Sequence, residues 1–182
     1  MNILSLPGAD ATTRLSDGTP IRLRPPRPLD ADALGRLVES LSPADRRRRF
    51  HGAVAALPDR VLARMCRLDA DDTVAFVAED VERGTLVGDV RAVRDATGHD
   101  AEFALMVGTG WQRRGLGRLA LGTLLAGAAA RGWHWLYGHV QADNRSMLSL
   151  AAGCGFRPSA HRGDPGIVVV EARVAGAWRA AA

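Results

Sequence analysis

The sequence contains no lysine, so all 24 of its basic residues are arginine. Aromatic residues are scarce as well, with four Trp, four Phe and one Tyr among 182 residues, and the core must be built mainly from Leu, Val and Ala. The missing lysine excludes a phosphate-binding loop of the Gly-Lys-Ser/Thr type. The formal net charge is only +4, with 20 acidic residues interleaved. Because no helix concentrates arginine with aromatic residues, we expect no nucleic-acid partner.

Cysteine is scarce, and long apolar runs and targeting signals are absent from the sequence. The two cysteines, Cys66 and Cys154, form neither a CxxC pair nor a zinc-ligand spacing. They predict a reduced, cytoplasmic protein without a metal site. The longest apolar stretch, residues 119–130, is interrupted by glycine and threonine and is too short to span a bilayer. Residues 1–14 carry no basic segment followed by an apolar run, so no signal peptide is predicted. We therefore expect no membrane partner.

Hydrophobic periodicity changes along the chain, which predicts a mixed α/β fold with both an antiparallel meander and parallel crossovers. Residues 1–16 have no pattern and are predicted to form a flexible N-terminal arm, followed by a single domain over 17–182. The strands are expected at 21–24, 73–78, 85–93, 101–107, 135–140 and 167–174, with one more short strand near Phe156. The helices are expected after the N-caps Asp30 and Ser42 and over 59–68, 115–131 and 144–152.

The strand–turn–helix unit over residues 101–117 is the segment that points to chemistry. Its residues 112–117 are Gln-Arg-Arg-Gly-Leu-Gly, directly before a long Leu/Ala-rich helix. Glycine in the first turn of a helix lets a ligand approach the backbone closely. The free N–H groups of that turn bind phosphate, and the arginines of residues 113–118 add positive charge. The segment predicts a site for a pyrophosphate-bearing ligand; the alternative is a glycine-rich helix start used only for close packing.

This segment resembles the [RQ]-x-x-G-x-[GA] acyl-CoA loop of the GNAT acyltransferase superfamily, and the resemblance covers residues 17–157. Asn-Arg-Ser-Met over 144–147 and Gly-Phe over 155–156 stand where the family has its Asn-led helix and its Gly-Phe turn. More specifically, Asp-Gly-Thr-Pro-Ile-Arg-Leu-Arg-Pro over 17–25 and Leu-Ser-Pro-Ala-Asp-Arg over 41–46, followed by Arg-Phe at 49–50, resemble the acyltransferase domain of bacterial Pat-type protein lysine acetyltransferases.

The resemblance implies a GNAT-like, mostly antiparallel sheet of six to seven strands, flanked by helices. A splay is implied between the strands at 101–107 and 135–140. It also implies an activity, which is transfer of the acetyl group of acetyl-CoA to a lysine ε-amine of a protein by direct attack in a ternary complex. Acyl-CoA synthetases are candidate protein substrates.

Residue roles follow from the same resemblance. Glu102 matches the carboxylate that serves as general base in Pat-type enzymes. Many GNAT enzymes place a tyrosine general acid in the Asn-led helix, where this chain has Ala151, so we expect no tyrosine acid there. Acyl-CoA binding is assigned to Met106, Val107, Gln112, Arg113, Arg114, Gly115, Leu116, Gly117, Arg118 and Asn144.

Other titratable residues are also candidates for a role in catalysis. Asp89, His99 and Asp100 are alternative bases, but each is more typical of a turn or surface position. His134 and His139 flank the strand at 135–140, where a structural role is expected.

The sequence allows alternatives for the arginine run at 46–49 and for the function. The arginine run at 46–49 is either a solvated helix face or a surface that steers an acidic partner or the CoA phosphates. A small-molecule amine acetyltransferase and a non-catalytic acyl-CoA-binding regulatory domain remain alternative functions. Acyl-chain preference and oligomeric state do not follow from the sequence.

Overall fold

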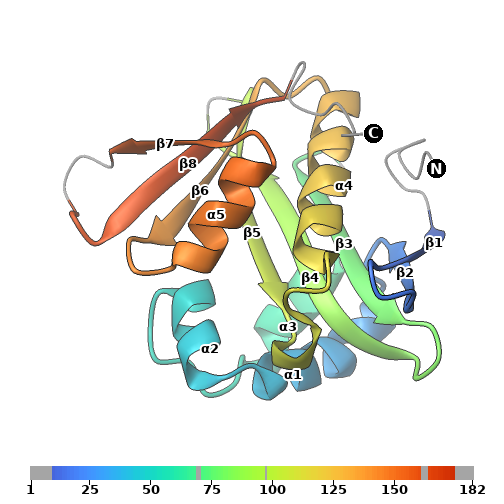
Figure 1. The fold of residues 1–182 in the computed structure, drawn as a ribbon. Helices are drawn as coiled ribbons and strands as arrows, with labels where there is room; N and C mark the ends of the chain where they lie inside the picture. The colour runs from blue at the N-terminus through green and yellow to red at the C-terminus, as the bar shows by residue number, and fades with distance from the viewer. Residues whose placement is uncertain (1–9, 69–70, 97, 161–163, 175–182) are drawn as a thin grey trace.

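The computed structural model describes residues 10–68, 71–96, 98–160 and 164–174. Within these residues the strands form one sheet of order β1-β2-β3-β4-β5-β6-β8-β7, with helices on both faces (Figure 1). The strands are β1 (Ala11–Arg14), β2 (Pro20–Arg24), β3 (Thr73–Asp80), β4 (Thr85–Arg94), β5 (Asp100–Val107), β6 (Trp135–Gln141), β7 (Arg157–Ala160) and β8 (Ile167–Arg173). The helices are α1 (Ala31–Ser40), α2 (Pro43–Phe50), α3 (Asp59–Cys66), α4 (Leu116–Ala130) and α5 (Arg145–Gly153), with short 3-10 turns at Pro28–Asp30 and Thr109–Trp111.

The sheet is mostly antiparallel, as predicted. Every pair of neighbouring strands is antiparallel except β5 and β6. The described residues contain eight strands rather than six to seven, because β1 adds an edge strand to β2. β1 lies inside the segment predicted to be a loose arm, so that prediction is wrong for residues 11–14. Residues 1–9 of the predicted arm lie outside the described residues.

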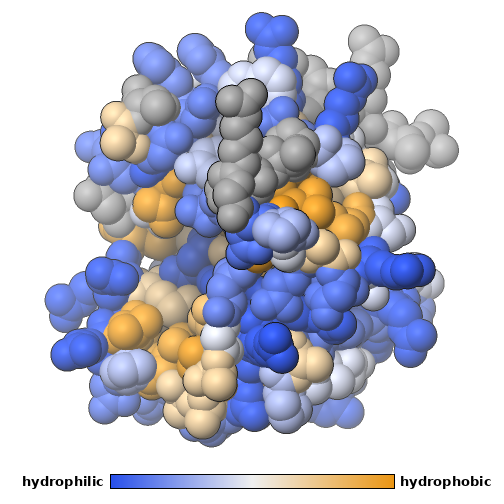
Figure 2. Space-filling view, turned by 90° about the vertical axis from the view of Figure 1, so that its left-hand side faces the viewer, coloured by the Kyte–Doolittle hydropathy of each residue, from blue (hydrophilic) through white to orange (hydrophobic). Residues whose placement is uncertain are grey.

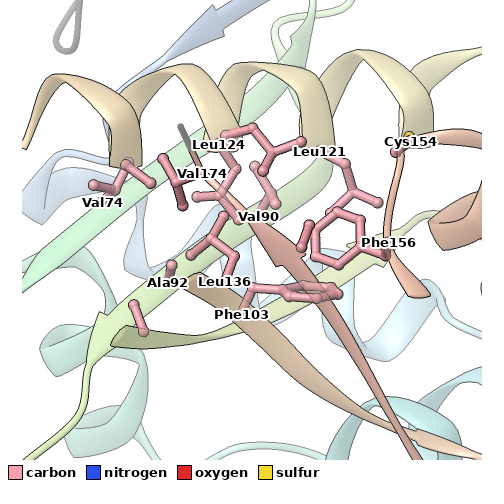
Figure 3. Close-up of a cluster of buried hydrophobic side chains, with 14 of the residues drawn as sticks. Val74, Val90, Ala92, Phe103, Leu121, Leu124, Leu136, Cys154, Phe156 and Val174 are labelled. Atoms are coloured by element: carbon pink, nitrogen blue, oxygen red, sulfur yellow. The ribbon is translucent and has the colours of Figure 1, made fainter. Parts of the chain in front are cut away.

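Two hydrophobic clusters fix the helices to opposite faces of the sheet. The larger one packs α4 and α5 on β3–β6 and β8 through side chains such as Leu121 and Leu124, with the Phe103 and Phe156 rings 5.0 Å apart (Figure 3). The second packs α1 and α3 on the other face through Leu34, among others. Because strand side chains alternate between faces, Val90 and Ala92 of β4 and Phe103 of β5 belong to the first cluster, whereas Met106 of β5 belongs to the second.

The predicted caps at Asp30 and Ser42 have different outcomes. The Ser42 hydroxyl accepts a hydrogen bond from the Asp45 N–H at 3.1 Å, and α2 starts at the following proline, as predicted. α1 does start after Asp30, but this carboxylate does not cap the helix. It accepts hydrogen bonds from Arg24 at 2.7 and 2.9 Å and from the Arg27 N–H at 2.6 Å. An ion pair with Arg24 of β2, six residues earlier in the chain, therefore replaces the cap.

Candidate active site

The sheet opens beside Glu102. β5 and β6 pair only through residues 100–102 of β5 and 135–137 of β6, although both strands continue. The predicted splay is therefore present, and it begins directly after Glu102. On the α4 face, the ring of Phe103 lies against Gly138, where a side chain on the β6 residue would collide with it. The divergence leaves the facing edges of the two strands without strand partners.

Glu102 projects from the face of the sheet that also carries α1–α3. Cross-strand register places Val93, Tyr137 and Glu171 in one row with Glu102, and paired residues share a face. The Glu102 side chain is 53% exposed, and its Oε1 lies 3.0 Å from Nδ1 of His139. Sequence reasoning expected a structural role for this histidine; the structure pairs it with the proposed base. Only the strand register, which the sequence does not show, could have revealed the contact.

Tyr137 is part of the same surface. Its hydroxyl lies 3.4 Å from Oδ2 of Asp95 and donates to this carboxylate. Burial, followed by the nearby charges of Asp95 and Glu102, raises the pKa of the Tyr137 phenol. The phenol therefore stays protonated at neutral pH, as a donor rather than a base.

The arginine run at 46–49 is not a uniform solvated face. The Nε atom of Arg49 is fully buried and has no hydrogen-bond partner among the described residues. Burial lowers the pKa of Arg49, while the charges of Asp89 and Glu102 act in the opposite direction. The neighbouring Arg47 offers its carbonyl to the Gln141 amide at 3.5 Å. α2 therefore contacts the end of β6 beside the splay. Arg49 places a positive charge near Glu102.

The loop before α4 has the backbone geometry expected of an anion site. Gly115 precedes the helix with φ of 89°, which a side-chain-bearing residue rarely adopts, and Arg113 has φ of 59°. A Cβ atom on Gly115 would meet only Ser16, at 3.7 Å, so the space beside it is open. The first N–H groups of α4 have no intrahelical acceptors. This helix start can therefore bind phosphate oxygens.

The side chains of this loop divide into anchoring and exposed groups. Arg114 forms an ion pair with Asp17 and a cation–π contact with Trp111, 4.3 Å from the ring centre. Gln112 donates to Asp45 at 3.0 Å. These contacts fix the loop to the β1–β2 turn and to α2. The predicted binding residue Arg114 is therefore engaged within the protein.

Arg113 and Arg118 are the loop arginines with exposed side chains, and Arg118 donates to the Gly153 carbonyl at 2.9 Å. Leu116 and Met106 are buried and can offer a ligand only backbone groups.

The Asn-led helix forms where it was predicted. Asn144 accepts a hydrogen bond from the Met147 N–H at 3.2 Å and so caps α5. Gly117 lets α4 approach this helix, because a Cβ there would come within 2.8 Å of Leu150. Ala151, at the position of the family's tyrosine acid, is fully buried, and burial raises the pKa of the Cys154 thiol. Neither residue offers a proton-transfer group to the splay.

Among the described residues, no group of three or more His, Cys, Asp or Glu side chains could hold a metal ion. No helix in this part of the chain is long and apolar enough to cross a membrane.

A splayed sheet, an exposed carboxylate at the splay and a helix start with a positive-φ glycine occur together here. The family model of the acetyltransferase (GNAT) domain matches residues 21–157. The chain belongs to the GNAT acetyltransferase family. This GNAT acetyltransferase is 30% identical over 144 residues to Acetyltransferase PA5475 of Pseudomonas aeruginosa. The aligned residues cover 78% of this chain and 77% of the relative.

Solved structures show the same fold. The GNAT domain of S. lividans PAT has a TM-score of 0.84 and 26% identity, over 90% of this chain and 96% of that one. A cAMP-binding acyltransferase from Mycobacterium smegmatis has a TM-score of 0.63 and 24% identity, and this GNAT acetyltransferase covers 47% of it. Spermidine N-acetyltransferase from Vibrio cholerae, solved with CoA and spermine, has a TM-score of 0.71, with 17% identity over 86% of this chain and 97% of that one. The last two likenesses show the fold alone.

Proposed function

We propose that this protein transfers the acetyl group of acetyl-CoA to a lysine ε-amine of a protein substrate, with Glu102 as general base. The position of Glu102 carries the proposal. Its carboxylate is exposed, and Glu102 belongs to the last residue pair before β5 and β6 separate. From there β5 runs five residues to Val107, about 17 Å at 3.3–3.4 Å per residue. An extended acyl-pantetheine chain would lie along this edge.

The α4 start is the proposed pyrophosphate site. The N–H groups over residues 115–118 would hold the phosphates, and the exposed Arg113 and Arg118 would add charge. Two neighbours support this assignment, since the spermidine acetyltransferase was solved with CoA and a putative acetyltransferase, yncA from Salmonella typhimurium, with acetyl-CoA. In this proposal Gln112 and Arg114 shape the loop, and Met106, Val107, Leu116 and Gly117 contribute backbone. Asn144 positions α5 beside the ligand.

A base is required because the acceptor amine is protonated at neutral pH. With an ordinary lysine pKa near 10.4, holding the amine neutral at pH 7 costs about 4.6 kcal/mol. Glu102 would remove this proton, directly or through one water. The amine would then attack the thioester carbon, and a backbone N–H on the unpaired edge of β5 would stabilise the oxyanion. The CoA thiol needs little acid assistance to leave, because a free thiol has a pKa of about 8.5.

Exposure around Glu102 supports a protein acceptor. Val93, in the same cross-strand row, is 47% exposed, and Trp135 on the same face of β6 is 40% exposed. The surface seen in Figure 2 is hollowed between the part carrying β6–β8 and the lower part carrying the first helices. A lysine on a protein surface could enter such an open site. The likeness to the PAT domain supports the same acceptor class, with acyl-CoA synthetases as candidates.

The test is amine-dependent release of CoA thiol from acetyl-CoA, with acetylated sites read by mass spectrometry. We expect lysine acetylation of a protein such as an acyl-CoA synthetase. Glu102→Gln should lower kcat by about 100-fold or more, within the usual contribution of general acid–base catalysis. Val93→Thr, a surface change in the same row, is the control and should keep kcat. Turnover on polyamines but on no protein would contradict the acceptor assignment, and an unchanged rate in Glu102→Gln would contradict the base.

A further inference from the structure

The contact between His139 and Glu102 is the feature of the site that the proposed function does not use. The two side chains come from β6 and β5, on strands that are no longer paired at His139. Their polar atoms nevertheless lie 3.0 Å apart, and the imidazole is 30% exposed. The T-shaped packing of His139 on the ring of Tyr137, with centres 5.9 Å apart, holds the imidazole from the strand side. This contact therefore bridges the mouth of the splay.

The ordinary pKa values of the groups involved indicate what this contact can do in the reaction. An ordinary carboxyl group has a pKa of about 4.3, which is about six units below that of an alkylammonium group. A proton taken from lysine by a lone carboxylate is therefore returned easily. An ordinary imidazole, with a pKa of about 6.5, holds the proton about 100-fold better. A carboxylate that passes its proton to an imidazole makes the overall transfer less unfavourable.

We propose that His139 takes up, from Glu102, the proton that Glu102 removes from the acceptor amine. This inference rests on the proposed function. One ammonium N–H bond breaks and an O–H bond forms on Glu102. That O–H bond then breaks, and an N–H bond forms at Nδ1 of neutral His139. The freed amine pair attacks the thioester carbon, the C–S bond breaks, and the thiolate takes the second amine proton. His139 returns its proton to solvent, so atoms and charge balance.

The charged groups around the pair are compatible with this transfer. Arg49 on α2 faces Glu102, and the charge of Glu102 acts to raise the pKa of Arg49 against the larger lowering by burial. Asp89 and Arg91 on β4 neutralise each other in a buried ion pair. From β6 and β8 the surroundings add Tyr137, a protonated phenol, and Glu171 in the next position of the row, with the uncharged Val169 opposite His139 itself.

His139→Gln separates proton transfer from positioning, because the glutamine amide can still donate to Glu102 but cannot accept a proton. We expect a kcat lowered about tenfold or more at pH 7, unchanged KM for acetyl-CoA, and a pH profile of kcat that differs from that of the wild-type enzyme. With an acceptor peptide whose lysine is replaced by the less basic aminoethylcysteine, the deficit should shrink. His134→Gln, which changes an exposed histidine stacked on His99, is the matched control and should behave like wild type.

The outcomes separate this inference from the function on which it rests. If the wild-type enzyme acetylates the acceptor and His139→Gln has the same rate and pH profile, the proton transfer is refuted while the function stands. An equal deficit with both acceptors would show that His139 only positions Glu102, which also overturns the inference. If the wild-type enzyme turns over no amine at all, the proposed function fails, and the role of His139 fails with it.

Discussion

Gly138 lies directly after the last β6 residue that pairs with β5, and Gly138→Ala tests how tightly this point is packed. A Cβ atom there would lie 2.7, 2.8 and 3.1 Å from three carbons of the Phe103 ring. Carbon atoms normally approach to about 3.5–4.0 Å, so the ring would have to move by close to 1 Å. It has little room to do so, because it is buried against Phe156 with centres 5.0 Å apart (Figure 3).

The expected loss of stability is the difference of two terms. Overpacking a core costs about 1–3 kcal/mol. Alanine recovers roughly 0.5–1 kcal/mol over glycine within a strand, because glycine loses more conformational freedom on folding. With the middle of each range, about 2 kcal/mol less about 0.75 kcal/mol, the net loss for Gly138→Ala is about 1.25 kcal/mol. For a chain of this size that corresponds to a Tm lowered by about 2.5–5 °C.

Urea unfolding, followed by far-UV circular dichroism, measures this loss as a lower midpoint with an unchanged slope. Gly110→Ala is the matched control, because nothing lies within 4 Å of a Cβ at that position. Phe103→Leu should relieve part of the collision, so the double variant with Gly138→Ala should be more stable than the sum of the single effects. A Gly138→Ala protein as stable as the Gly110→Ala control, or strictly additive effects, would refute the packing argument.

Two further predictions concern the ion pairs that fix the N-terminal part of the fold. Arg24→Ala leaves the Asp30 carboxylate buried without its main partner and should cost about 3 kcal/mol in urea unfolding, whereas removing the exposed Arg22 should cost about 1 kcal/mol or less. A hydrogen bond from Arg114 lowers the pKa of Asp17 from 3.8 to about 2. Since the folded pKa lies below the unfolded one, this stabilisation is present above about pH 4 and is lost as the pH falls towards 2. Asp17→Asn should therefore flatten the acid limb of the stability curve; an unchanged acid limb would contradict this assignment.

The order of elements and the glycine-containing turn before α4 could be predicted from the sequence, because both depend on local patterns. The glycine at 115 indicated the helix start, and the structure gives it a positive φ there. Alternating and helical periodicities located the strands and helices to within about two residues. β1 was missed because a four-residue edge strand with the sequence Ala-Thr-Thr-Arg carries almost no apolar pattern.

Long-range contacts could not be predicted in the same way. The pairing of His139 with Glu102 depends on the register of two strands that are 37 residues apart in sequence. Arg46 and Arg49 belong to a run of four arginines that look equivalent, yet the Nε atoms of these two are buried. Asp30 looked like a helix cap because the sequence does not show that the Arg24 side chain, six residues earlier, reaches this carboxylate. In each case the packing of the folded chain decided what the side chain does.

The arginine-only composition has a chemical consequence for an enzyme of this kind. Acetyl-CoA is an acylating reagent, and a lysine in the ion pairs of Arg24, Arg91 or Arg114 would lose its charge on acetylation. A guanidinium group is charged at every working pH and is not a nucleophile towards the thioester. The contacts that hold the sheet and the turn before α4 in place are therefore inert to the reagent that the protein is proposed to bind. Acetylation by acetyl-CoA therefore cannot remove the side-chain charges on which these ion pairs depend.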